Sequence, residues 1–317
     1  MKKRVKIVVF SICLLLIFSV LLYFTQLMLT PIFPAESTGM VVGYKLLEEN
    51  SLDVVFLGAS QTFTGIDAGR LTREFGIESF DLCSSGQIMS MMPLYFDYAL
   101  KTQTPKIVMV EVYSIFDDPT GCYDSSLAWN YGPMPASKEK YQSLLKVFGG
   151  DKWKAFEYCY LPYLVYHSRW SSFYPSLFYK YYINPKDSVD ISNRGFYGRD
   201  HVEQVTIQYY ENDEITQRII PESNQDDMLY MKKVCDQKGI QLVFYKSPSA
   251  DWSRSDSIST KSFMKDNGLT FIDLNDYIDE IGIDASTDFH SVNHLNVSGA
   301  EKTTEYLASI LNRYMHN

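Results

Sequence analysis

Short runs of apolar residues recur along the chain, and most of them end in small or polar residues and lead into a helical pattern. The first run, at 53–58, ends at Gly58 and is followed by Ala59 and Ser60. Apolar, β-branched runs of this length are typical of strands that are buried on both faces. Comparable runs predict four further strands, at 78–82, 106–112, 240–245 and 269–274.

Amphipathic stretches alternate with these runs. They predict helices at about 67–75, 89–101, 137–148, 153–160, 225–237, 259–267 and 297–314. Strand–turn–helix steps of this kind are typical of right-handed βαβ units, which build a parallel sheet. The pattern therefore predicts an α/β fold with a parallel five-stranded sheet.

A long uncharged apolar run lies near the N-terminus, from Ile7 to about Met28, after a basic start at 1–6. Roughly 20 apolar residues are enough to span a bilayer as a helix. The basic flank predicts that the start of the chain stays in the cytoplasm and that the rest lies outside. A cleaved signal peptide is the alternative, but the run is long for one and 33–35 matches a cleavage site poorly.

These features predict three parts of the chain. They are a cytoplasmic stub with a transmembrane anchor at 1–30, a membrane-proximal linker at 31–50, and an extracytoplasmic domain at 51–317.

The α/β rhythm breaks between the third and fourth predicted strands, at about 117–212. This stretch is rich in Tyr, Trp, Phe and Pro, and we interpret it as a long insertion. Insertions at the carboxyl edge of a sheet usually shape the substrate site. The alternatives are a packing subdomain and a surface that docks on a membrane partner.

Charge and cysteine content exclude two classes of function. The 317 residues carry a net charge of -9, whereas a nucleic-acid-binding protein needs a basic surface. The five Cys have neither the CxxC pairing nor the spacing of metal ligands. No dinucleotide or phosphate-binding loop motif is present. We therefore expect no metal, no cofactor and no nucleic-acid partner.

Candidate chemistry begins at Ser60, on the turn between the first predicted strand and the next helix. Such turns lie at the carboxyl edge of a parallel sheet, where ligands bind. The alternative is that Ser60 only caps the helix. Near the other end of the chain, His290 and His294 lie within five residues, although the whole sequence has only five His. A loop after the fifth strand can bring His294 to Ser60, and imidazole is a suitable base for activating a serine.

Three short motifs together resemble the SGNH/GDSL hydrolase superfamily: Gly58-Ala-Ser60, Cys83-Ser-Ser-Gly86, and His294-Leu-Asn296 with Gly299. More narrowly, they resemble its membrane-anchored envelope branch, which includes DltD-like and AlgJ-like proteins. The resemblance implies a three-layer, flavodoxin-like sheet. It also implies that Ser60 is the nucleophile, that Ser60 and Gly86 offer backbone N–H groups to an oxyanion, and that His294 is the general base.

Two positions depart from the motifs of this superfamily. The acid that orients the histidine normally lies three residues before it, where this chain has Ser291. Asp288, six residues before, is an alternative if the loop folds back, and so is a hydroxyl or a carbonyl. The Asn expected after the third strand is not evident in 111–116.

The resemblance implies acyl transfer through a serine ester. We expect an extracytoplasmic esterase or O-acyltransferase that acts on envelope polysaccharide or a teichoic-type polymer, with a membrane-bound O-acyltransferase as a partner. The alternative is a catalytically weak or inactive scaffold that binds a polysaccharide or such an acyltransferase.

Overall fold

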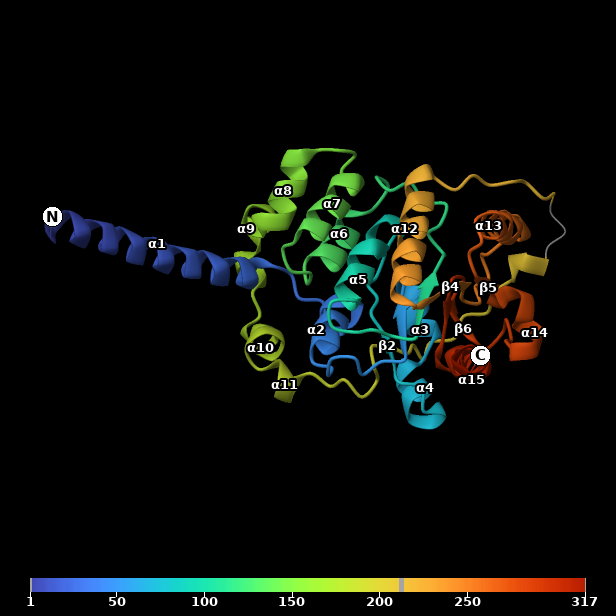
Figure 1. Ribbon diagram of the computed structural model, residues 1–317. Coiled ribbons are helices and arrows are strands. Elements are labelled where there is room, and N and C mark those ends of the chain that lie inside the picture. The colour runs from blue at the N-terminus through green and yellow to red at the C-terminus, as the bar shows by residue number, and fades with distance from the viewer. Residues whose placement is uncertain (1, 211–213, 317) are drawn as a thin grey trace.

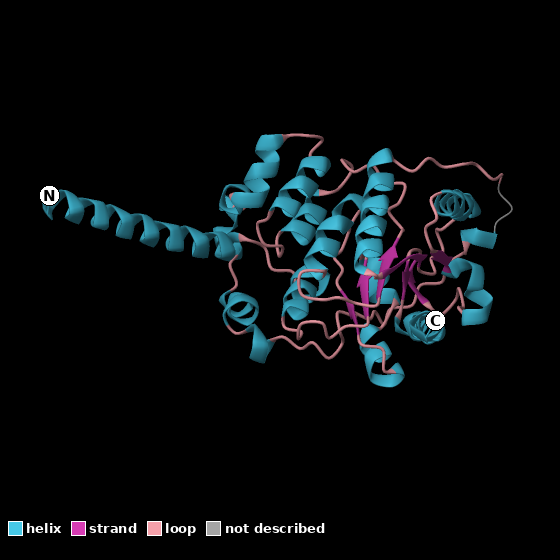
Figure 2. Ribbon diagram, viewed as in Figure 1, coloured by secondary structure: helices cyan, strands magenta, loops and turns pink. Residues whose placement is uncertain are grey.

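Five short strands pair into a parallel sheet in the computed structural model, which describes residues 2–210 and 214–316. They are β1 (Val54–Leu57), β2 (Ser79–Asp81), β3 (Ile107–Glu111), β4 (Gln241–Lys246) and β5 (Phe271–Asp273). Their order is β2-β1-β3-β4-β5, and every pairing is parallel. This is the strand order of flavodoxin-like sheets. The predicted α/β fold with a parallel five-stranded sheet is confirmed, and Figure 2 shows the sheet among its helices.

Most helices of the α/β body follow strands, as the sequence pattern predicts. They are α3 (Ser60–Gly65), α4 (Ala68–Phe75), α5 (Met92–Ala99), α12 (Glu222–Lys238), α13 (Arg254–Asp266), α14 (Ile278–Ile281) and α15 (Val297–His316). Single helical turns precede α5 and α14, at η2 (Met89–Met91) and η6 (Leu274–Tyr277). A two-stranded antiparallel hairpin, β6 (Phe289–Ser291) and β7 (His294–Leu295), lies between α14 and α15 and was not predicted.

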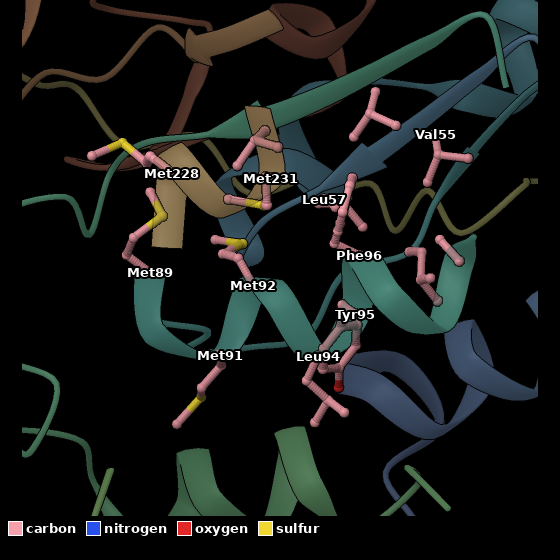
Figure 3. Packing of buried hydrophobic residues seen from close by; sticks show 14 of the residues in the cluster. Val55, Leu57, Met89, Met91, Met92, Leu94, Tyr95, Phe96, Met228 and Met231 are labelled. Carbon is pink, nitrogen blue, oxygen red and sulfur yellow. The ribbon is translucent and has the colours of Figure 1, made fainter. Parts of the chain in front are cut away.

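Alternation along the strands divides the core into two layers, one on each face of the sheet. On one face, Val55 and Leu57 of β1 pack with residues of α5 and α12, and Figure 3 shows Met92 and Phe96 of α5 facing this strand. On the other face, Val54 and Phe56 of β1 belong to a second cluster, with residues of α4, α14 and α15. Burying each such side chain contributes about 1.5–3 kcal/mol. The sheet is therefore held rigidly between two helical layers, and its carboxyl edge is a fixed platform.

The first helix, α1 (Lys2–Leu29), projects away from this body (Figure 1). Within Arg4–Leu29, the most apolar window of 18 residues has a mean hydropathy of 3.0, and none of this window is buried within the protein. By length and composition, α1 can cross a membrane.

Residues 31–50 do not form an extended linker. They contain a π-helical turn, η1 (Pro34–Thr38), and a helix, α2 (Gly39–Lys45). Val41 and Tyr44 of α2 are buried in the main core cluster. The two residues lie three positions apart, so they share one face of the helix. The segment that follows the apolar helix is thus packed firmly onto the α/β body.

The aromatic-rich insertion is largely helical. It contains α6 (Asp124–Tyr131), α7 (Lys138–Val147), α8 (Lys152–Tyr160), α9 (Pro162–Val165), η3 (His167–Ser172), α10 (Pro175–Phe178), η4 (Tyr179–Ile183), α11 (Pro185–Ser188) and η5 (Gln208–Tyr210). Part of its predicted end, at 211–212, lies outside the described residues. In Figure 1, α9 and α10 lie near the end of α1, and α9 contacts α1.

Candidate active site

Ser60 occupies the sharp turn between β1 and α3. The turn requires a glycine at position 58, because a Cβ there would lie 2.1 Å from Oγ1 of Thr62 and 2.8 Å from Cβ of Glu111. Ser60 is the first residue of α3, and Ala59 stands at the N-cap position without a side-chain hydrogen bond. The side chain of Ser60 therefore does not serve as a helix cap and is available for another partner.

That partner is His294, which the β6–β7 hairpin carries over the carboxyl edge of the sheet. Nε2 of His294 lies 2.6 Å from Oγ of Ser60, although the two residues are 234 positions apart in the chain. Nδ1 of the same ring lies 2.9 Å from Oγ of Ser291, which pairs with His294 across the hairpin. The other histidine of the motif, His290, has its ring against His201 instead. The structure thus brings Ser60, His294 and Ser291 together.

A chain of hydrogen bonds continues from Ser291 into the protein, and we refer to it as the hydrogen-bond chain. Oγ of Ser291 donates to Oδ1 of Asn293 (3.1 Å), and Nδ2 of Asn293 donates to Oη of Tyr113 (3.0 Å). Oη of Tyr113 donates to Oδ2 of Asp251 (2.8 Å). Since Ser291 uses its proton on Asn293, it accepts from Nδ1–H of His294. This fixes the tautomer in which the Nε2 lone pair faces the serine.

Asp288, the alternative acid from the sequence, is used elsewhere. It is fully buried, and its carboxylate accepts hydrogen bonds from Oγ of Ser298 (2.7 Å), the backbone N–H of Asp284 (2.7 Å) and Nζ of Lys302 (2.5 Å). These contacts tie the start of the hairpin to α15. The group that touches the far nitrogen of His294 is therefore the hydroxyl of Ser291, because the carboxylate of Asp288 is held by other donors.

The turn after β2 lies beside the turn after β1. The backbone N–H of Ser84 donates to the carbonyl of Gly58 (3.2 Å). Gly86, in this second turn, has φ of 57°, and a Cβ at this position would lie 2.4 Å from Oγ of Ser126. Within the described part of the chain, the backbone N–H groups of Ser60 and Gly86 donate no hydrogen bond. Both remain available for an oxyanion, as the resemblance implies.

The surroundings of His294 favour its neutral form. The pKa of this imidazole is lowered to about 4, mainly by burial and to a lesser extent by the nearby His290 and Lys246, while Asp251 opposes the shift. At neutral pH the ring can accept a proton from the serine at once. The imidazolium that forms during reaction has little stabilisation, however, because in the described structure no carboxylate touches the ring.

A buried ion pair lies beside the hydrogen-bond chain, and sequence reasoning did not identify it. Nζ of Lys246 is 3.1 Å from Oε1 of Glu111, and the two side chains are 0% and 1% exposed. Oε2 of Glu111 accepts a hydrogen bond from the backbone N–H of Tyr113 (2.7 Å). The ion pair therefore holds the backbone of Tyr113, which belongs to the hydrogen-bond chain. The two charges end neighbouring strands, β3 and β4. Opposite charges at the ends of two apolar runs were a signal in the sequence, but only the strand order makes them neighbours.

Tyr113, Asn293 and Asp251 were also missed. They stand in three separate loops at the carboxyl edge, and none belongs to a recognisable motif.

Comparisons with known proteins add little. No protein-family model matches the chain, and no curated protein is similar to it in sequence. A solved structure from Bacteroides fragilis, described as a candidate acylhydrolase, aligns over 86% of this chain and 92% of its own length, with 10% identity and a TM-score of 0.38. A gut microbial diltiazem-metabolizing enzyme aligns over 85% of this chain and 48% of its own, with 15% identity and a TM-score of 0.27. At these values the similarities carry no argument about function.

Proposed function

We propose that this chain is a membrane-anchored serine esterase or O-acyltransferase whose catalytic domain lies outside the membrane. One observation carries the proposal: Oγ of Ser60 lies 2.6 Å from Nε2 of His294 at the carboxyl edge of the sheet. A serine on a strand-to-helix turn with an imidazole at this distance has the geometry of an activated nucleophile.

The proposed reaction has two steps. His294 takes the proton of the Ser60 hydroxyl as Oγ bonds to the carbonyl carbon of an ester, and the backbone N–H groups of Ser60 and Gly86 hold the oxyanion. The tetrahedral intermediate collapses, His294 gives the proton to the leaving alcohol, and an acyl-serine remains. A second hydroxyl compound then attacks this ester by the reverse route. Water gives an acid and makes the protein an esterase; a sugar hydroxyl gives a new ester and makes it an acyltransferase.

The hydrogen-bond chain takes the place of the carboxylate that usually stands behind the histidine. Ser291 orients the ring, and Asn293 and Tyr113 connect Ser291 to the charge of Asp251. Orientation of the ring is therefore retained. Stabilisation of the imidazolium is weaker than with a direct carboxylate, because Asp251 acts from a distance.

The position of the site relative to α1 supports a substrate close to the membrane surface. The backbone N–H of Ser85, next to Gly86, donates to the carbonyl of Glu36 (2.8 Å). Glu36 follows the end of α1 at Leu29 by so few residues that the connection can span at most about 25 Å even when fully extended. An envelope polysaccharide or a teichoic-type polymer at the membrane surface would be within reach. We propose such a polymer as substrate and a membrane-bound O-acyltransferase as acyl donor, as in the DltD-like and AlgJ-like proteins that the motifs resemble.

A second candidate is a binding scaffold with little or no catalysis. The observation that favours it is the contact of Ser291, rather than a carboxylate, with the far nitrogen of His294. In that case the same edge would bind the polymer or the acyltransferase without turning it over.

A serine-directed fluorophosphonate separates the two candidates. We expect the probe to label the wild-type chain at Ser60 and Ser60→Ala to abolish labelling. Ser309→Ala, at an exposed serine of α15, is the matched control and should label normally. Absence of labelling in the folded wild-type protein at every pH tested would contradict the enzymatic proposal and favour the scaffold.

A small activated ester then distinguishes hydrolysis from transfer. With an aryl acetate as donor, an esterase releases acetate at a rate that an added oligosaccharide leaves unchanged. An acyltransferase forms an acetylated oligosaccharide at the expense of acetate, which mass spectrometry detects.

A further inference from the structure

A large cavity opens at the end of the domain where α1 enters, and we refer to it as the membrane-end cavity. Its volume is about 690 Å³, within the usual range of ligand sites. The last turns of α1 contribute Tyr23 and Leu27 to its wall, α2 contributes Val42, and the insertion contributes Tyr166 and Tyr182. The wall is thus mostly aromatic and aliphatic and is continuous with the apolar helix.

The charged groups of this wall all have one sign. Lys45, Lys140 and Lys186 line the cavity, and no Asp or Glu does so among the described residues. The whole chain has 38 acidic and 29 basic residues, so a purely basic cavity runs against its composition. Lys45 and Lys186 are exposed and stand at the rim.

Lys140 lies in the interior, and the described part of the chain places no counter-charge beside it. Its residue is only 4% exposed, and Nζ donates to the carbonyl of Met134 (2.9 Å). Within residues 2–210 and 214–316, no carboxylate lies within ion-pair distance of this ammonium. Burial lowers the pKa of Lys140 to about 8, so the group still carries its charge at neutral pH. An unpaired buried charge is costly, and a bound anion would remove that cost.

The ligand must therefore combine an anionic group with an apolar part. A free phosphate would satisfy the lysines but would leave the tyrosine-lined wall unfilled. An apolar chain would fill the wall but would leave Lys140 without a partner. A phospholipid provides both, and the segment that is apolar enough to span the bilayer lines the cavity with its last turns. Basic cavities beside membrane helices are suited to anionic headgroups, and Tyr is enriched at the membrane surface.

We propose that the membrane-end cavity binds one anionic phospholipid of the surrounding bilayer, with its phosphate near Lys140 and its acyl chain along the wall formed by α1 and the insertion. This inference rests on the proposed anchoring of α1 but not on any catalytic activity. The bound lipid would join α1, α2 and the insertion into one unit and so fix the height of the domain above the membrane.

Native mass spectrometry of the full-length chain, released from nanodiscs, tests the proposal. The nanodiscs contain equal amounts of phosphatidylglycerol and phosphatidylcholine with identical acyl chains. We expect one phosphatidylglycerol to be retained about 10-fold more often than phosphatidylcholine. Both lipids carry a phosphodiester, but the quaternary ammonium of phosphatidylcholine cancels the charge of its phosphate and is repelled by the three lysines of the cavity.

Three variants locate the site. Lys140→Met should abolish the preference for phosphatidylglycerol, and Val42→Trp, which fills the cavity, should abolish retention of both lipids. Lys233→Met, at an exposed lysine outside the cavity, is the matched control and should behave as the wild type. Val42→Trp keeps the test decisive if Lys140→Met fails to fold.

Three outcomes would overturn the proposal. The first is equal retention of the two lipids by the wild type, which would indicate nonspecific apolar binding. The second is an unchanged preference in both folded variants. The third is protection against thermal unfolding by inorganic phosphate equal to that by phosphatidylglycerol, which would indicate a soluble anion as ligand.

Discussion

Two buried lysines lie in the two regions of this molecule for which we propose a function, and their surroundings differ. Lys246, at the carboxyl edge of the sheet, is fully buried and lies 3.1 Å from the carboxylate of Glu111. Lys140, in the membrane-end cavity, is almost as buried, but among the described residues its ammonium donates a hydrogen bond only to the carbonyl of Met134. At the sheet edge the protein supplies its own counter-charge, whereas in the cavity it leaves that contact to another molecule. A buried charge that is paired within the protein stabilises the geometry of its site, whereas a buried charge without an ion-pair partner indicates a place where a ligand binds.

The largest effect is expected at the sheet edge, from the residue that we propose as the base. His294→Ala removes the base that faces Ser60 and should lower ester hydrolysis or fluorophosphonate labelling by about 10³–10⁴-fold. The initial rate of labelling measures this loss. His167→Ala, at an exposed histidine of the insertion, should retain the wild-type rate, and a rate within a few-fold of wild type for His294→Ala would exclude the proposed base.

Next in size is the effect of unpairing the lysine of the sheet edge. Lys246→Met leaves the buried carboxylate of Glu111 without its cation and should lower the free energy of unfolding by about 3–5 kcal/mol. Thermal or denaturant unfolding monitored by circular dichroism measures the change. The exposed substitution Lys233→Met should change stability by less than about 0.5 kcal/mol. Equal free energies of unfolding for the two variants would mean that the ion pair does not stabilise the carboxyl edge of the sheet.

The acid limb of the activity profile provides the third test. Because the pKa of His294 is lowered to about 4, the ring stays neutral and the wild-type labelling rate should hold until the pH falls close to 4. Ser291→Asp places a carboxylate beside the ring, which favours the imidazolium and should raise this midpoint by about 1–2 units. The labelling rate measured between pH 3.5 and pH 8, a range of about 4.5 units, gives both midpoints. A wild-type midpoint near 6.5, the ordinary value for histidine, would contradict the buried environment described for this ring.

A smaller effect is expected from the hydrogen-bond chain. Tyr113→Phe breaks the connection between Asn293 and Asp251 and should lower kcat by about 10-fold with little change in KM, because the ring is positioned less well. Tyr123→Phe, at a tyrosine that is 79% exposed, is the matched control. A KM that is about 10-fold higher, with an unchanged kcat, would indicate that Tyr113 contacts the substrate instead.

The smallest effect completes the comparison of the two lysines. Lys140→Met removes an unpaired buried charge, so in detergent without anionic lipid it should leave stability unchanged or raise it by about 1 kcal/mol. The same unfolding measurement as for Lys246→Met applies. A loss of several kcal/mol would show that Lys140 has a structural partner within the chain, and the contrast between the two regions would then fail.

Local sequence patterns determined the elements of the fold. The five apolar runs became the five strands, and the helices expected at 89–101, 137–148 and 225–237 formed with ends shifted by a few residues. Asn296 caps α15, since its Oδ1 accepts the backbone N–H of Gly299 (3.1 Å). Apolar runs, helical spacing and capping residues involve neighbours within a few positions, so they can be recognised in a single sequence. The length of the apolar run that forms α1 can be recognised in the same way.

Local patterns failed where a residue's role depends on distant neighbours. Residues 31–50 were predicted to be a membrane-proximal linker, but Val41 and Tyr44 of this segment are buried in the main core cluster, where Tyr44 packs against Phe80 of β2. Asp288 stood at a plausible distance in sequence from His294, but Lys302 and Ser298 hold its carboxylate.

The sequence by itself determined an apolar N-terminal helix, an alternating α/β chain, and the two residues most suited to be nucleophile and base. Only the tertiary structure decided that Ser291 contacts the far ring nitrogen of His294, that Tyr113 reaches Asp251 across 138 positions, and that no carboxylate of the described residues pairs with Lys140. The physical reason is that hydrogen bonds and ion pairs join whichever groups the strand order and the loops bring within about 3 Å. That proximity is a property of the folded chain as a whole and leaves no trace in the spacing of residues along it.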